Sequence, residues 1–358
     1  MFERWPRLLR RPALGLLVLG AGVWGGCAGE YPQTTFRPVT RFGELINELF
    51  ASVFWWTLLV LVLVEVLLVF IVLRYRAREG SPAPKPVHGH TGLEVAWTLG
   101  PAVIVAILAV ATVRTVFAVQ QPAPEGALEV EVVGHQWWWE FRYPEYGVVT
   151  ANDLYLPVGR PVHLKLRSAD VVHSFWIPQL GGKRDVNPSP AGRDGGTPRY
   201  NHLVFEVTEP GEYLGQCAEF CGTSHAIMRL RAVAQEPAEF ARWVASMRAG
   251  AAEPVDELAQ RGREVFLRSP CIACHAVEGT PARGALGPSL TRFGARATVG
   301  AGVVPNTVEN VERWITSPAS LKPGVLMPGV REAGGGLPPT GLSAEDVRAV
   351  AAYLTSLN

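Results

Sequence analysis

Four side chains that can bind a metal lie within one short stretch of the sequence, GQCAEFCGTSHAIMRL at residues 215–230. They are Cys217, Cys221, His225 and Met228, in the spacing C-x3-C-x3-H-x2-M. Thiolate, thioether and imidazole ligands together suit copper, whereas zinc sites usually take four nitrogen or sulfur ligands and rarely a thioether. A disulfide between Cys217 and Cys221 is the alternative in an exported protein, but it would leave His225 and Met228 unexplained.

A second imidazole for the same site is His173, in the segment DVVHSFWIPQL. This histidine lies at the end of a predicted strand among apolar residues. A single histidine in that setting is more often a core residue with a satisfied hydrogen bond than a ligand. The soft ligands elsewhere in the same predicted domain favour the ligand interpretation here.

A second pair of cysteines forms the motif CIACH, with Cys271, Cys274 and His275 directly after a predicted helix. The pattern C-x-x-C-H is typical of c-type haem attachment. Two thiols on one helical turn bond to the haem vinyl groups, and the following histidine faces the iron. A redox disulfide or half of a zinc site is the alternative, but His275 and the helical surroundings favour haem.

The second axial ligand of such a haem is predicted to be Met327, in LKPGVLMPGV. Methionine ligation raises the haem potential, and Pro328 stiffens the loop that presents the sulfur. The alternative, a plain core side chain, does not suit a loop so rich in glycine and proline.

The N-terminal segment, residues 1–27, has the form of a signal peptide. Arginines precede a short apolar run, and small residues precede Cys27. Either lipidation of Cys27 or simple cleavage nearby fits this pattern. Both imply that the domains after the membrane segments are exported.

A transmembrane hairpin is predicted at residues 42–119, with helices at about 53–73 and 95–117. Each apolar run meets the roughly 20 residues that a membrane helix needs. The connecting loop is basic, which places it in the cytoplasm and everything after the hairpin outside. A charged side chain is costly in lipid, so Glu65 in the first helix is expected to face a neighbouring subunit.

Two further domains are predicted after the hairpin. Residues 126–234 contain short alternating segments such as PVHLKLR, HLVFEV and MRLRAV, which predict a small antiparallel sandwich or barrel. A linker at residues 235–254 is expected to hold a short helix around AEFARWVASM. Residues 255–358 are predicted to be all helical, with helices in DELAQRGREVFLR, in TVENVERWITS capped by Thr307, and in SAEDVRAVAAYLTSL capped by Ser343.

The C-terminal residues resemble a class I cytochrome c through CIACH, LGPSL, RWITSPASLKPGVLMP and VAAYLTSL. The preceding region resembles subunit II of haem–copper cytochrome c oxidase through GHQWWWEFRYPE, VVHSFWIPQLGGKRDVNP and GEYLGQCAEFCGTSHAIM. The resemblance implies a cupredoxin-like Greek-key domain that holds the binuclear CuA centre. The copper ligands that it implies are His173, Cys217, the backbone carbonyl of Glu219, Cys221, His225 and Met228.

The same resemblance implies three further roles. Trp137 corresponds to the aromatic residue that receives electrons beside CuA, although ordinary strand packing is the alternative. The Glu219 side chain corresponds to a ligand of a Mg2+ ion shared with subunit I. Glu94 corresponds to the carboxylate at the cytoplasmic entrance of a proton pathway, or is a solvated charge at a helix end. The segment at residues 187–202 is longer than the usual family loop.

Together the two resemblances imply a caa-type oxidase subunit in the bacterial plasma membrane, with both metal domains on the periplasmic side. The expected electron order is external donor, haem c, CuA and then subunit I, which reduces oxygen; subunit III is a further expected partner. A CuA subunit of a nitric oxide reductase and a membrane-anchored copper or thiol chaperone are the alternatives. A quinol oxidase subunit II would lack Cys217 and Cys221. The net charge of +1 gives no indication of nucleic-acid binding.

Overall fold

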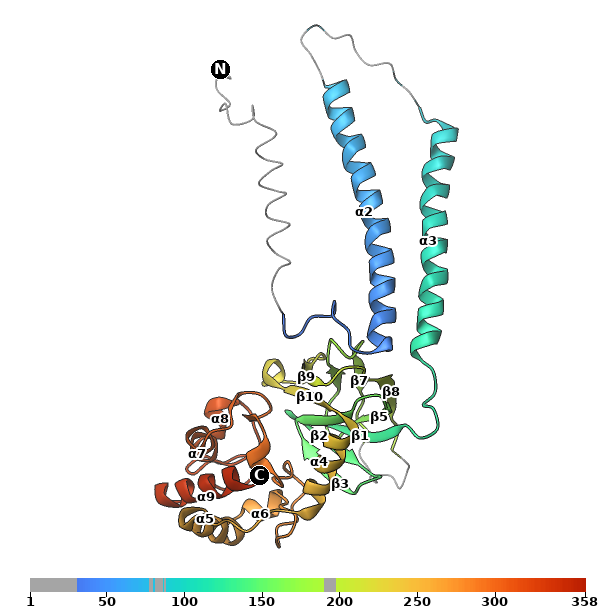
Figure 1. Ribbon diagram of the computed structural model, residues 1–358. Helices are drawn as coiled ribbons and strands as arrows, with labels where there is room; N and C mark the ends of the chain where they lie inside the picture. Colours follow the sequence, from blue (N-terminus) through green and yellow to red (C-terminus); the bar gives the residue numbers. More distant parts are fainter. Residues whose placement is uncertain (1–30, 77–79, 81–85, 87, 190–197) are drawn as a thin grey trace.

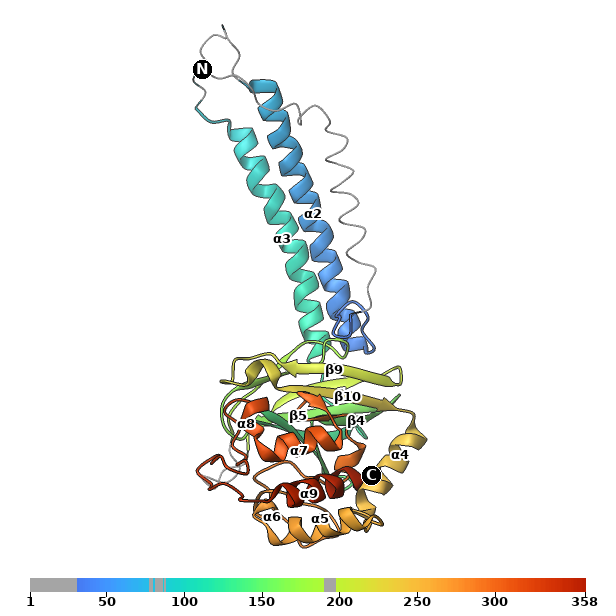
Figure 2. The same ribbon diagram turned by 90° about the vertical axis from the view of Figure 1, so that its left-hand side faces the viewer.

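The computed structural model describes residues 31–76, 80, 86, 88–189 and 198–358, and Figure 1 shows their arrangement. The predicted signal peptide with Cys27, most of the basic loop and the centre of the long 187–202 segment lie outside the described residues. Two long helices, a β-sandwich and a helical lobe succeed one another along the chain. The two long helices extend side by side from one end of the sandwich (Figures 1 and 2).

The paired helices are α2 (Arg41–Tyr75) and α3 (Thr91–Val119), which contain the predicted spans and extend beyond them. Both are long and apolar enough to cross a membrane. Thr40 caps α2, because its hydroxyl oxygen accepts the Gly43 N–H at 3.0 Å. The same hydroxyl donates to the carbonyl of Leu180 at 2.7 Å, which ties the start of α2 to the sandwich.

The β-domain consists of two five-stranded sheets. The first has the order β3-β2-β1-β5-β8 and the second β4-β10-β9-β6-β7. The strands of the first are β3 (Val148–Ala151), β2 (Trp138–Tyr143), β1 (Leu128–His135), β5 (Pro161–Ser168) and β8 (Asn201–Glu206). Those of the second are β4 (Asp153–Pro157), β10 (Arg229–Gln235), β9 (Gly211–Cys217), β6 (His173–Trp176) and β7 (Arg184–Val186).

The predicted sandwich is confirmed, but two of its strand pairings are parallel and not antiparallel as expected. Strand β1 runs parallel to β5, and β4 runs parallel to β10. Parallel neighbours need a long connection, and here the chain crosses to the other sheet in between. The predicted alternation in β5 is confirmed, since Val162, Leu164 and Leu166 are all buried.

The region predicted as a linker contains α4 (Pro237–Ala249), so the helix expected there is confirmed. Its apolar face carries Phe240, Val244 and Met247, which are buried in the core of the sandwich. The aromatic ring of Trp243 stacks on Tyr155 of β4 with centroids 4.4 Å apart. Helix α4 is therefore packed against the β-domain, and the connection between the two domains is shorter than the predicted linker at residues 235–254.

The C-terminal lobe contains α5 (Glu257–Arg268), α6 (Cys271–Cys274), α7 (Val308–Thr316), α8 (Pro318–Leu321) and α9 (Ala344–Ser356). The three predicted helices are α5, α7 and α9, and the caps Thr307 and Ser343 are confirmed. Helices α5 and α9 pack closely, since a Cβ at Gly262 would lie 1.9 Å from the carbonyl oxygen of Ala349. Only glycine permits this contact between the first and last helices of the lobe.

Candidate metal centres

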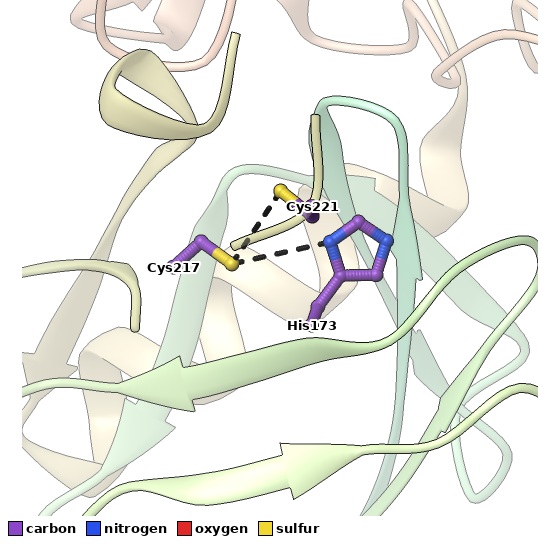
Figure 3. Close-up of side chains that lie close together, drawn as sticks. All are labelled: His173, Cys217 and Cys221. Carbon is purple, nitrogen blue, oxygen red and sulfur yellow. Dashed lines mark hydrogen bonds between the residues drawn. The ribbon is translucent and has the colours of Figure 1, made fainter. Parts of the chain in front are cut away.

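The copper ligands predicted from two distant segments come together at one end of the sandwich. Cys217 ends β9, and Cys221 lies in the loop that leads to β10. Their Sγ atoms lie 3.8 Å apart, and the Cys217 Sγ lies 3.9 Å from Nδ1 of His173 on β6 (Figure 3). All three side chains are buried. The disulfide alternative does not agree with this structure, in which both cysteines are free thiols.

The remaining members of the predicted set complete the cluster. Nδ1 of His225, in the short 3-10 helix η2 (His225–Ile227), lies 3.6 Å from the Cys221 Sγ. The sulfur of Met228 lies 3.8 Å from the same Sγ and is fully buried. The backbone carbonyl of Glu219 lies 3.2 Å from the Cys217 Sγ. Two thiols thus lie at the centre, with two imidazoles, a thioether and a carbonyl around them, a donor set suited to a pair of copper ions.

The electrostatics of the two thiols also fit metal binding. The hydrogen bond from Cys221, together with that from His173, lowers the pKa of Cys217 to about 3. The neighbouring Cys217 raises the pKa of Cys221 above its usual range. A bound metal cation would replace the proton that the second thiol retains, because the thiolate is the form that ligates.

His173 is oriented by a carboxylate that the sequence analysis did not identify. Its Nε2–H donates to Oδ1 of Asp170 at 2.8 Å, so in the neutral imidazole the Nδ1 lone pair faces the thiols and can bind a metal. Burial opposes the charged imidazolium, but the hydrogen bonds of Asp170 and Cys217 outweigh it and raise the pKa of His173. Asp170 also accepts the backbone N–H of Gln136 at 2.7 Å and that of Val171 at 2.7 Å, which hold the carboxylate in place.

Replacing Asp170 by alanine is expected to weaken copper binding by about 10- to 100-fold, the usual loss when a partner of a ligating histidine is removed. The measurement is a copper titration of the metal-free protein against a competing chelator. Asp185→Ala removes an exposed carboxylate from β7 of the same domain and should change nothing. Equal affinity in the wild type and Asp170→Ala would show that Asp170 does not orient the ligand.

Trp137 lies against the copper loop, defined here as residues 217–228. Its indole Nε1–H donates to the backbone carbonyl of Cys221 at 3.0 Å. The side-chain amide of Gln136 donates to the same oxygen at 2.7 Å. Trp137 is only 7% exposed, which agrees with the strand-packing alternative. Its contact with the copper loop also agrees with the electron-transfer role.

The predicted haem ligands lie in the C-terminal lobe. Cys271 and Cys274 occupy the single turn of α6, and both are free thiols. Nδ1–H of His275 donates to the carbonyl of Pro288 at 2.8 Å, which leaves Nε2 available for iron. Burial lowers the pKa of His275 and keeps the imidazole neutral, as a metal ligand must be. Pro288 lies within the LGPSL motif, but nothing local in the sequence indicates this hydrogen bond.

The other predicted haem ligand and the predicted proton-pathway carboxylate lie in simpler surroundings. Met327 is half-buried in the loop after α8, and its pairing with His275 stays a prediction. Glu94 lies in the first turn of α3 and accepts the backbone N–H of His90 at 3.2 Å. This capping contact accounts for Glu94 as a helix-end charge, and the proton role stays a prediction.

Comparison with known proteins agrees with this arrangement. The transmembrane domain of cytochrome c oxidase subunit II matches residues 39–115, its periplasmic domain matches residues 148–234, and cytochrome c matches residues 259–358. Cytochrome c oxidase subunit 2 of Alkalihalophilus pseudofirmus is 40% identical over 338 residues, which are 93% of either chain. The chain belongs to the cytochrome c oxidase subunit II family. It is therefore a membrane-anchored subunit of an oxidase, with a cupredoxin-like domain and a cytochrome c domain.

Other members and neighbours differ in how much of the chain they match. Cytochrome c oxidase subunit 2 of Bacillus subtilis is 32% identical and covers 92% of this chain. Quinol oxidase subunit 2 of Bacillus cereus is 31% identical over 226 residues, which are 62% of this chain and 74% of that one. The solved periplasmic domain of subunit II from Bradyrhizobium japonicum is 28% identical and covers 36% of this chain and 98% of that one, with a TM-score of 0.32.

Proposed function

We propose that this subunit is the point at which electrons enter a caa-type terminal oxidase, passing from an external donor to haem c, then to a binuclear copper centre, and on to subunit I. The observation that supports this most strongly is the cluster of six copper donors. Two segments more than forty residues apart, around His173 and at residues 217–228, supply them to one buried site. A copper carrier of another class would not need the C-terminal cytochrome lobe.

The proposed ligands divide between the two domains. His173, Cys217, the carbonyl of Glu219, Cys221, His225 and Met228 hold the copper pair; Cys271 and Cys274 bond covalently to the haem, with His275 and Met327 as its axial ligands. These groups supply one-electron redox chemistry when bound. The chain contributes rigidity, because buried ligands with fixed hydrogen bonds move little when the charge changes. Fusing both domains also replaces a diffusive encounter by an effective concentration of about millimolar.

The remaining roles concern the complex in the membrane. We propose that the sandwich and the cytochrome lobe face the periplasm of a bacterial plasma membrane, and that subunits I and III contact this chain. The Glu219 side chain is proposed to bind Mg2+ at the subunit I interface, and Glu94 to lie at the entrance of a proton pathway in a proton-translocating enzyme. The oxygen-reducing site lies in subunit I.

A nitric oxide reductase with a CuA subunit is the second candidate function, because the reaction is decided by the catalytic subunit. Oxygen uptake by the purified complex separates the two. A rate that depends on a reduced donor supports the oxidase. Reduction of nitric oxide without oxygen uptake would support the alternative.

The isolated subunit is expected to contain a copper pair and one haem that survives denaturation. Both ligand sets are complete in this chain, and thioether bonds are not broken by unfolding. Elemental analysis and a haem stain on a denaturing gel test this. Zinc in place of copper, or haem lost on denaturation, would overturn the assignment of that centre.

A further inference from the structure

The cytochrome lobe lies against the end of the sandwich that carries the copper loop (Figures 1 and 2). One part of this contact is made by the methionine loop, defined here as residues 322–328, which includes Met327. The Ser224 hydroxyl of the copper loop donates to the carbonyl of Pro323 at 2.6 Å. Ser224 is only 1% exposed, so this hydrogen bond is enclosed between the two loops. The loop that presents the haem ligand therefore touches the loop that presents the copper ligands.

Lys322 connects the two loops a second time. Its Nζ donates to the carbonyl of Ile227 in the copper loop at 3.1 Å and to that of Gly300 in the cytochrome lobe at 2.6 Å. The side chain is 2% exposed, and burial lowers its pKa to about 7. An amino group is rarely buried in this way unless its hydrogen bonds are satisfied, and here carbonyl oxygens on both sides of the interface satisfy them.

Trp137 is enclosed at the same interface. A Cβ at Gly324 would lie 2.9 Å from Cη2 of the Trp137 ring, so the methionine loop rests directly on the indole. Gly324 has φ +80°, a conformation that residues with a side chain rarely adopt. Glycine is therefore favoured here both by the backbone conformation and by the lack of space for a Cβ beside Trp137. Beside it, the backbone N–H of Arg229 donates to the carbonyl of Ala301 at 3.1 Å, which adds a main-chain bond between the domains.

We propose that Lys322 is a positioning residue that locks the cytochrome lobe onto the copper loop, with Trp137 enclosed between them. Electrons then pass between the domains without the lobe having to dock again at each turnover. The indole face is covered by the chain itself, so an external donor protein is received by the cytochrome lobe and not by Trp137. This inference rests on the proposed function and adds to it the contacts that hold the cytochrome lobe against the sandwich.

The test uses the complete purified oxidase with Lys322→Met, which keeps an apolar stem and removes the donor. Removing a buried donor leaves its carbonyl acceptors unpaired, which is enough to change an equilibrium by roughly ten-fold or more. After rapid photoreduction of haem c, transfer to the copper centre is therefore expected to be slower by about ten-fold. The haem c potential and the copper spectrum should be unchanged. Arg331→Met removes an exposed charge from the same lobe and should transfer at the wild-type rate.

Hydrogen exchange on the same samples reports docking without depending on electron transfer. Exchange at residues 134–139 and 322–328 should rise in Lys322→Met and stay at the wild-type level in Arg331→Met. Gly324→Ala, which places a methyl group against Trp137, should give the same increase if Lys322→Met does not assemble. Wild-type exchange in an assembled Lys322→Met complex would overturn the proposal, and so would wild-type exchange in Gly324→Ala if Lys322→Met does not assemble. If the wild-type protein itself transfers no electron from haem c to copper, the proposed function fails, and the exchange result still decides the docking.

Discussion

Replacing Cys217 by serine is expected to stop electron transfer from haem c to subunit I while haem c stays attached and reducible. The Cys217 Sγ lies within 3.9 Å of both the Cys221 Sγ and Nδ1 of His173, so it occupies the centre of the ligand cluster. Serine oxygen is a hard donor and would be a poor ligand for the soft copper ions that the Cys217 thiolate is proposed to hold. The loss should exceed the roughly 100-fold that removing a partner of a ligand causes. Rapid mixing of the reduced complex with oxygen should oxidise subunit I and leave haem c reduced.

The matched variants for this experiment come from the same domain. Cys221→Ser should behave like Cys217→Ser, because the two thiols share one site. His202→Gln removes an exposed imidazole from β8 and should keep the wild-type rate. If haem c is oxidised at the wild-type rate in Cys217→Ser, electrons bypass the copper site and Cys217 has a structural role.

The parts of the molecule that the sequence predicts well are those encoded by neighbouring residues. The copper loop carries Cys217 and, within the next eleven residues, three further predicted ligand side chains and the Glu219 carbonyl. These groups lie close together because they are close in the chain. The motif at Cys271 and Cys274 is likewise one turn of helix α6. The caps Thr307 and Ser343 were also predictable, because capping depends only on residues in the first turn.

Features that depend on long-range packing were not predictable in the same way. The parallel pairing of β1 with β5 is set by the topology of the whole sandwich, and alternation alone reports only which face is buried. Asp170 lies three residues before His173, but its hydrogen bond depends on the turn between them and on Gln136 in the turn between β1 and β2. Lys322 reads as an ordinary exposed lysine in sequence. Its burial becomes visible only when two domains are docked.

Replacing Met327 by leucine is expected to remove the sixth haem ligand, leave the haem covalently attached and lower its reduction potential. Methionine sulfur favours reduced iron, and axial ligands move haem potentials over a range of about 0.8 V. The weak near-infrared band that methionine ligation gives to oxidised haem should disappear. A redox titration and an oxidised spectrum of the purified complex measure both effects.

Met247→Leu is the matched control, because it makes the same exchange at a buried methionine of α4 in the core of the sandwich. Such a volume-conserving exchange usually costs less than about 1.5 kcal/mol, and the haem spectrum should not change. Persistence of the near-infrared band in Met327→Leu would show that another group binds the iron. Hydrogen exchange on Met327→Leu measures whether the two domains stay docked. A lower potential with wild-type exchange would separate the ligand role of Met327 from the contact that Lys322 and Pro323 make in the same loop.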